Sequence, residues 1–300
     1  MAKIKTYVTR GNIVESIHES KCLILDNNNK VLYTTNHQND LIYPRSAMKV
    51  FQAIPFIVSK AHKKYRLTEK QIAISCSSHY GEQEHIKVIK EWIKKLGINE
   101  KQLLCGIHNP LNLFSSNKLL LSGTKPRQIH NNCAGKHLGM VSACLMYGYG
   151  VEDYVNLNHP YQILIRKILK HFMQCQILQK HKGIDGCSAP QYAFPLKNLS
   201  IAMINLIKKF NEESKYTNEV RLILNSISKY PTLTGSKTKY DSQLMLATNG
   251  KIFAKWGAEG VLMFAHKHKK VGGVIKVKDG NERALPSVSN EILKKLKIIN

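Results

Sequence analysis

Residues 12–35 read NIVESIHESKCLILDNNNKVLYTT, and residues 250–280 read GKIFAKWGAEGVLMFAHKHKKVGGVIKVKDG. The first stretch has two apolar, strand-like runs on either side of the turn signal DNNNK, which predicts a β-hairpin. The second stretch divides into three short strands separated by glycine-containing turns. If strands from both ends of the chain pair into one sheet, these two stretches decide the fold.

The sequence between these two ends is mainly helical. Residues 84–97, EHIKVIKEWIKKLG, begin with an acidic residue and end at Gly97, which is typical of a helix. Three further segments predict helices: residues 159–178, 198–213 and 289–299. Because no repeat, low-complexity tract or linker divides the chain, we expect a single domain over residues 1–300. Its predicted fold class is α/β (α+β), a sandwich of helices around a mainly antiparallel sheet.

Composition narrows the class of protein. The 43% apolar content is that of a globular chain. The formal charge of +25 is spread over nearly every segment, with no arginine-rich helix or RNP-like motif, so we expect no dedicated nucleic-acid partner. No apolar run is long enough to span a membrane, and the first residues lack the apolar core of a signal peptide. Seven cysteines in unmatched spacings then predict reduced thiols and a cytoplasmic location.

Ser46 and Lys49 are the first candidate catalytic residues. They lie in PRSAMKV, residues 44–50, at the start of an apolar run that predicts a helix. Residues i and i+3 share a helix face, so the serine hydroxyl and the lysine amine can meet. A buried, neutral lysine can take the proton of a nucleophilic serine. The alternative is a serine that caps the helix and a lysine that reaches solvent.

Three other segments concentrate reactive side chains. They are ISCSSHYGEQEH at 74–85, HNNCAGKHLGM at 130–140 and GIDGCSAPQYAFP at 183–195. Each could be an ordinary turn, helix start or loop. Taken together, their serine, cysteine, histidine, aspartate and lysine residues predict a site, because glycine- and proline-flanked loops often present side chains to a ligand.

The same segments raise the question of a metal. Cys133 and Cys187 as thiolates, with His137 and Asp185, would complete four ligands for zinc. The spacings are weakly diagnostic, since no Cys-x2-Cys pair is present. The alternative is two buried thiols beside a polar turn.

Five segments, in this order, carry a resemblance to a known family: PRSAMK, CSSHYGEQEH, NNCAGKHLGM, GIDGCSAP and KWGAEG. The chain resembles the rhizobial-type L-asparaginases, also called class 3 or thermolabile asparaginase II, over nearly its whole length. The resemblance implies hydrolysis of L-asparagine to aspartate and ammonia, a homodimer, and a fold related to serine β-lactamases, penicillin-binding proteins and glutaminases.

The resemblance also implies which residues act. It gives two Ser–Lys pairs, Ser46 with Lys49 and Ser78 with Lys255. The antibiotic-binding relatives have threonine after the strand lysine, whereas this chain has Trp256. That difference puts β-lactam recognition in doubt. A glutaminase or other small-amide hydrolase, and a penicillin-binding-type protein that forms acyl-enzymes, stay as alternatives.

For the metal, the resemblance implies zinc held by Cys133, Lys136 and Cys187, with Asp185 close by through water. In that case the lysine must be deprotonated, and His137 faces the substrate. The zinc would fix the position of the substrate, since Ser46 already supplies the nucleophile. Next to Ser46, Arg45 is a candidate to bind a substrate carboxylate, with an ordinary salt bridge at the helix start as its alternative. With Arg45 and His137, Asp185 completes the set of candidate substrate-binding residues.

Overall fold

The computed structural model describes residues 4–299, and its central element is an antiparallel sheet of six strands. Five strands lie in the order β1-β2-β10-β9-β8, and β3 pairs with β2 beyond the end of β1. The strands are β1 (Ile4–Arg10), β2 (Ile13–Leu25), β3 (Val31–Thr34), β8 (Ile252–Gly257), β9 (Val261–His266) and β10 (Val271–Val277). Ile275 lies opposite Cys22, so strands from the two ends of the chain pair as predicted.

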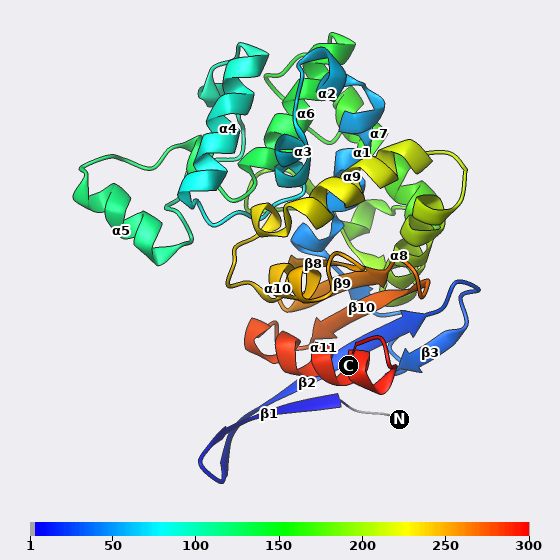
Figure 1. Cartoon of the computed structure of the whole chain (residues 1–300). Coiled ribbons are helices and arrows are strands. Elements are labelled where there is room, and N and C mark those ends of the chain that lie inside the picture. The colour runs from blue at the N-terminus through cyan, green and yellow to red at the C-terminus, as the bar shows by residue number, and fades with distance from the viewer. Residues whose placement is uncertain (1–3, 300) are drawn as a thin grey trace.

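Helices cover the sheet on both faces (Figure 1). The helix α8 (Leu196–Asn211) packs against β2, β9 and β10, while α11 (Leu285–Lys295) packs against β1 and β10 from the other side. Because both faces are covered, β8, β9 and β10 are almost wholly buried, which explains their continuous apolar runs. The expected sandwich of helices around a mainly antiparallel sheet is confirmed.

The remaining helices lie on the α8 side of the sheet or at its β8 edge (Figure 1). They are α1 (Lys49–Val58), α2 (Ala61–Lys64), α3 (Glu69–Ser75), α4 (Gln83–Leu96), α5 (Leu113–Leu121), α6 (Ala134–Tyr147), α7 (Pro160–Met173), α9 (Thr217–Lys229) and α10 (Tyr240–Ala247). Two short ladders join β4 (Leu41–Ile42) to β7 (Phe194–Pro195) and β5 (Lys182–Ile184) to β6 (Pro190–Tyr192). Four of the helices expected from the sequence are α4, α7, α8 and α11, and all four form. The helix α4 ends at Gly97, which has φ +66° as a helix C-terminus requires.

The helix predicted from Ser46 onward is divided in two. Residues Arg45–Met48 form a 3-10 turn, here called η1, and the α-helix α1 begins only at Lys49. The turn begins with the Ala47 N–H bonded to the Pro44 carbonyl, an i to i+3 bond that tightens the first turn. The helix α1 is buried nearly all round and packs against α6, α7 and α9, as a helix that is apolar on every side should.

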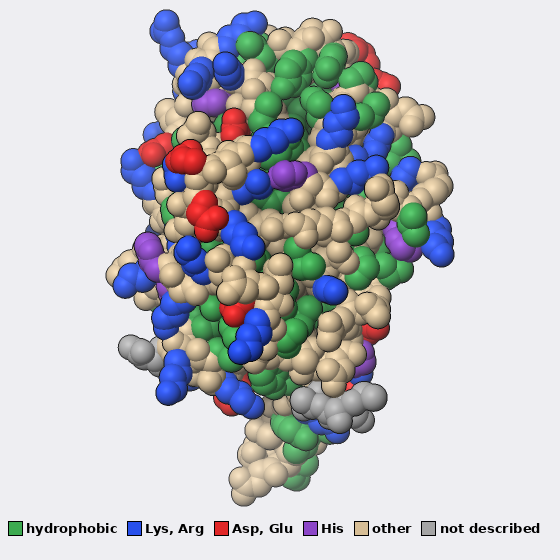
Figure 2. All heavy atoms as spheres, turned by 90° about the vertical axis from the view of Figure 1, so that its right-hand side faces the viewer, with side chains coloured by type: hydrophobic (Ala, Val, Ile, Leu, Met, Phe, Trp, Pro, Cys, Tyr) green, Lys and Arg blue, Asp and Glu red, His purple; other side chains and the backbone are tan. Residues whose placement is uncertain are grey.

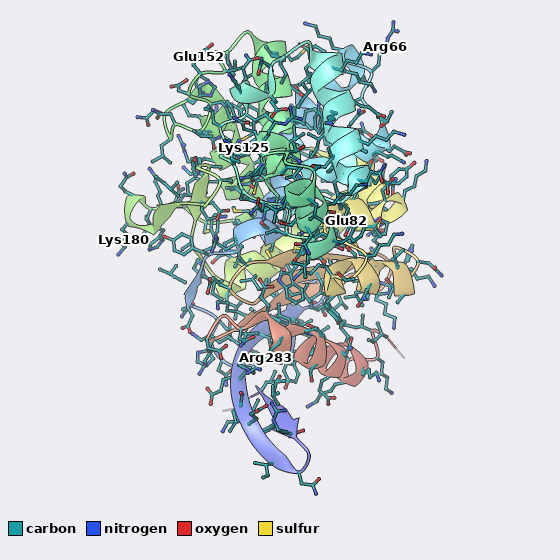
Figure 3. The ribbon with its side chains drawn as sticks, turned by 90° about the vertical axis from the view of Figure 1, so that its left-hand side faces the viewer. Arg66, Glu82, Lys125, Glu152, Lys180 and Arg283 are labelled. Atoms are coloured by element: carbon teal, nitrogen blue, oxygen red, sulfur yellow. The ribbon has the colours of Figure 1, made fainter. Side chains whose placement is uncertain are left out.

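Two of the elements that the sequence did not predict project from the molecule. The strand β1 pairs with the first half of β2, and this ribbon extends beyond the body of the molecule (Figure 3). The helix α5 also projects from the helical layer and has no buried side chain (Figure 1). Lysine and arginine side chains are spread over the face seen in Figure 2 among fewer acidic ones. In the described part of the chain, no helix is both long and apolar enough to cross a membrane.

Candidate active site

Three of the predicted serine and lysine residues line one cavity of about 230 Å³. They come from three different elements: Ser46 from the turn η1, Ser78 from the loop after α3, and Lys255 from the strand β8. Tyr80 and Trp256 form aromatic parts of the wall. Segments that are more than 200 residues apart in sequence therefore meet at one small, partly polar cavity.

A glycine lets the Ser46 turn lie directly against the sheet. A Cβ atom added at Gly257, the last residue of β8, would lie 2.3 Å from the carbonyl oxygen of Pro44 and 3.1 Å from the backbone nitrogen of Ala47. Any larger residue would push the turn away from the strand. Gly257 therefore sets the position of Ser46 relative to Lys255, two residues earlier on the same strand.

Lys49 lies buried beneath the cavity, with 1% of its surface exposed. Its amine donates to the carbonyl oxygen of Ser77, to Ser78 Oγ at 3.0 Å and to Cys133 Sγ at 3.3 Å. Burial lowers the pKa of Lys49, while a charge on Cys133 opposes this shift. Among the described residues, the serine that receives a hydrogen bond from Lys49 is Ser78, not Ser46.

The partner of Lys255 is a residue that the sequence analysis missed. Lys255 Nζ donates to Asp241 Oδ2 at 3.2 Å, and the two side chains are 2% and 1% exposed. Asp241 lies in the first turn of α10 and also lines the cavity. An aspartate at the start of a helix is common for local reasons, so nothing in the sequence marked it. Ser78 and Lys255 share the cavity, but their recorded hydrogen bonds go to Lys49 and Asp241.

Arg45 and Asp185 form an ion pair beside this site. Arg45 Nη2 lies 2.7 Å from Asp185 Oδ1, and Arg45 Nε donates to the same oxygen at 2.9 Å. The backbone of Arg45 has φ +51°, which is unusual for a residue other than glycine. Arg45 lines a neighbouring cavity that also includes Tyr43 and Gln191. Two of the three side chains predicted to bind the substrate, Arg45 and Asp185, therefore bind each other here.

Two thiols and a lysine meet at the start of α6. Cys133, Lys136 and Cys187 are each less than 5% exposed, and Lys136 Nζ lies 3.0 Å from Cys187 Sγ. A hydrogen bond from Cys133 and the charge of Lys136 lower the pKa of Cys187. Burial opposes a charge on Lys136, but the thiolate of Cys187 raises the pKa of Lys136 overall. Without a metal, this geometry favours a thiolate–ammonium pair.

A second close approach brings this cluster to the serine loop. A Cβ atom on Gly135 would lie 2.1 Å from the carbonyl oxygen of Ile74 in α3. Only glycine allows α6 to begin so near the end of α3. The segment that carries Cys133 and Lys136 therefore lies next to the segment that carries Ser78.

The metal-ligand set derived from the residues alone does not form. Within residues 4–299, no group of three or more histidine, cysteine, aspartate or glutamate side chains is placed to hold a metal. Asp185 is paired with Arg45, and His137 Nδ1 is hydrogen-bonded to the hydroxyl of Tyr154 at 2.7 Å. His137 is fully buried and is not part of the cavity wall. The two cysteines remain together, with Lys136 beside Cys187 and Lys49 beside Cys133.

Comparison with known proteins gives one family. The family model described as L-asparaginase II matches residues 6–300. No curated protein sequence matches the chain. Among solved structures, the chain is similar to a putative beta-lactamase from Bacteroides dorei, with 16% identity, a TM-score of 0.43 and coverage of 92% of this chain and 93% of that one. A beta-lactamase from Mycobacterium bovis aligns with 12% identity and a TM-score of 0.44, over 92% of this chain and 94% of that one.

Proposed function

The chain belongs to the L-asparaginase II family, and from this premise we propose that it hydrolyses L-asparagine to L-aspartate and ammonia. Membership of this family makes the protein an amidohydrolase. The observation that carries the proposal for the site is the cavity that joins Ser46 and Ser78, with a buried lysine directly beneath it. A serine nucleophile with a nearby amine base is sufficient chemistry to cleave an amide.

In the proposed reaction, Ser46 Oγ attacks the side-chain carbonyl carbon of asparagine, and its proton passes through the hydroxyl of Ser78 to Lys49. The C–N bond then breaks as the proton is delivered to nitrogen, so ammonia leaves and Ser46 carries an aspartyl ester. Water attacks this ester and gives a proton back to Ser46 as the C–O bond breaks. Aspartic acid leaves and ionises in solution, and the protein ends in its starting state.

The burial of Lys49 supports its role as the base. A lysine amine accepts a proton only when it is neutral, and burial disfavours the ammonium form. The bond between Lys49 and Ser78 supports a route in which Ser78 relays the proton. Lys255 lines the same cavity as Ser78, so the second Ser–Lys pair that the family resemblance implies remains a prediction.

We also propose that Cys133, Lys136 and Cys187 hold one zinc ion. Their convergence in a buried cluster supports this, since thiolates are preferred zinc ligands and a neutral amine can complete the set. When bound, zinc would offset the charge of two thiolates next to the substrate cavity. Arg45, His137 and Asp185 remain predictions as substrate ligands, and a substrate carboxylate would have to compete with Asp185 for Arg45.

Two alternatives share much of this site. A glutaminase would use the same chemistry on a substrate one methylene longer, and a penicillin-binding-type protein would form a lasting acyl-enzyme. Trp256 lines the cavity at the position where the antibiotic-binding relatives have threonine. This large side chain favours a small amino-acid amide as the substrate. The volume of about 230 Å³ also suits a molecule of this size.

The test is ammonia release from purified protein without a histidine tag, given asparagine or glutamine, alongside colour release from a chromogenic β-lactam. We expect ammonia from asparagine at the highest kcat/KM and no β-lactam turnover. Ser122→Ala, a substitution of an exposed serine in the loop after α5, is the matched control and should behave as the unaltered chain. Faster turnover of glutamine would support the glutaminase alternative instead.

We further propose a homodimer that works in the cytoplasm. The exposed apolar side chains of the β1–β2 ribbon support a second copy, because a two-stranded ribbon is marginally stable alone. Tyr7, Ile13 and Ile17 are more than half exposed there. All seven cysteines are free thiols, which supports a reducing compartment. Light scattering over a range of concentrations tests the dimer, and a constant monomer mass would contradict it.

A further inference from the structure

The carboxylate of Asp241 accepts three hydrogen bonds, two of them from the cavity lysine and its strand. Oδ2 accepts from Lys255 Nζ at 3.2 Å and from the backbone N–H of Trp256 at 2.9 Å, while Oδ1 accepts from the N–H of Ser242 at 2.9 Å. Both side chains of the ion pair are at most 2% exposed. One carboxylate oxygen therefore fixes both the side chain of Lys255 and the next peptide unit of β8.

A buried ammonium needs this partner. The transfer of an unpaired charge from water into the interior is costly, and removal of one member of a buried pair is costlier than removal of both. Among the described residues, Asp241 is the acid that forms an ion pair with Lys255, whose other recorded contact is the Trp256 carbonyl oxygen at 3.4 Å. Lys49, by contrast, has a carbonyl, a hydroxyl and a thiol as partners. The two lysines therefore lie in different chemical environments.

We propose that Asp241 is the positioning residue of Lys255: it holds this lysine as a fixed ammonium at the wall of the substrate cavity, so that Lys255 acts as a hydrogen-bond donor and not as a second base. This inference rests on the proposed amide hydrolysis for its chemical meaning. Under this proposal the two lysines have different roles. Lys49 exchanges the proton, and Lys255 stabilises negative charge that develops on the reacting carbonyl oxygen.

A purely structural role is the competing explanation. The bond from the Trp256 N–H ties the edge strand β8 to α10, and Gly257 then supports the Ser46 turn. Loss of Asp241 would in that case loosen the whole site, whether or not Lys255 is present. The two explanations differ in one respect, because a residue that acts through Lys255 should have no effect once Lys255 is gone.

The test is a double-mutant cycle with Asp241→Asn and Lys255→Met. Asparagine keeps the size and an acceptor for the Trp256 N–H but removes the charge. We expect Asp241→Asn to lower kcat for asparagine by about 10- to 100-fold with KM nearly unchanged. In a protein that already carries Lys255→Met, the same substitution should lower kcat by less than about 2-fold. Asp40→Asn, which removes an acid from a surface ion pair with Lys21, is the matched control and should leave kcat unchanged.

A second readout does not need asparagine as the substrate. The rate at which a fluorophosphonate labels Ser46 reports the same site, so a chain that is labelled but releases no ammonia would refute the proposed function and leave this inference testable. The proposal would be overturned if Asp241→Asn kept the full kcat and the full labelling rate. It would also be overturned if Asp241→Asn lowered kcat as much in the Lys255→Met protein as in the unaltered protein. If Asp241→Asn alone does not fold, the labelling rate of the double variant Asp241→Asn/Lys255→Met, in which both charges of the pair are removed, is compared with that of Lys255→Met. Equal labelling rates support the proposal, and a further 10-fold loss overturns it.

Discussion

Lys49 Nζ lies 3.0 Å from Ser78 Oγ, so the lysine one helical turn after Ser46 is bonded to a serine of another segment. This bond changes the expected proton route. Two separate Ser–Lys pairs would act side by side, whereas the observed contact supports the proposed route in which Ser78 relays the proton from Ser46 to Lys49.

Lys49→Met and Ser78→Ala should be non-additive. Each substitution breaks the same proton route, so each should lower kcat by about 10²- to 10⁴-fold, and the double variant should be no worse than the poorer single one. Ammonia release under saturating asparagine gives the three rates. If the two losses in kcat multiply, Lys49 and Ser78 act independently, and Ser78 does not pass the proton of Ser46 to Lys49.

Gly257→Ala should disturb the nucleophile without touching it. The new Cβ would lie 2.3 Å from the Pro44 carbonyl oxygen, so the Ser46 turn must move. We expect a loss of at least about 10-fold in kcat, since small misplacements of a reacting group are costly. Stability should fall by about 1–3 kcal/mol. Gly139→Ala is the control, because its Cβ would make only ordinary contact with Phe56 at 3.5 Å. Normal kinetics in Gly257→Ala would show that the turn is not held by the strand.

The zinc prediction is tested by elemental analysis of untagged protein. We expect about one zinc per chain, with Cys133→Ser and Cys187→Ser each binding much less. Cys175→Ser replaces a half-buried thiol outside the cluster and should leave the content unchanged. In the metal-depleted variants, KM for asparagine should rise more than kcat falls, because the ion is assigned to substrate position. Metal-free protein with full activity would refute the assignment.

Lys267 gives a pH-dependent prediction about stability. Its side chain is buried, donates to Ser228 Oγ at 2.7 Å and lies over the ring of Phe210. Burial lowers the pKa of Lys267 from 10.5 to about 8. The unfolded chain therefore binds a proton between pH 10.5 and 8 that the folded chain does not, so this lysine lowers stability as pH falls through that window.

The substitution Lys267→Met removes this penalty, which is about 3 kcal/mol at most, and it also removes the bond to Ser228. We expect a net gain in the free energy of unfolding at pH 7 that shrinks steadily between pH 8 and 10.5, measured by urea titration at fixed pH. Lys180→Met alters an exposed lysine and should show no such trend. A gain that is the same at pH 7 and pH 10.5 would contradict a penalty of electrostatic origin.

Much of the fold was predictable because its signals are local. The DNNNK turn fixed the hairpin of β2 and β3, and Gly97 marked the end of α4, since both depend on neighbouring residues. Among the elements that were missed are the ribbon strand β1 and the projecting helix α5. Neither buries a continuous apolar face in the body of the chain, so the patterns that reveal core elements are weak there.

The site was predictable only in part. Its segments could be named from the sequence, because reactive residues gather in short glycine-flanked loops. The contacts between them could not, since they depend on packing between distant elements. The spacing in the sequence predicted that Lys49 would contact Ser46, whereas in the structure Lys49 donates a hydrogen bond to Ser78. Asp241 and the pairing of Arg45 with Asp185 were hidden for the same reason.

The central claim is that Ser46 is the nucleophile, and covalent trapping tests it most directly. The protein is incubated with an electrophilic diazoketone analogue of asparagine, digested with trypsin and analysed by tandem mass spectrometry. Cleavage after Arg45 and Lys49 isolates residues 46–49, SAMK. The account predicts the label on Ser46 in this peptide, with loss of both label and ammonia release in a folded Ser46→Ala variant. A label on Ser78, or full ammonia release by Ser46→Ala, would contradict it.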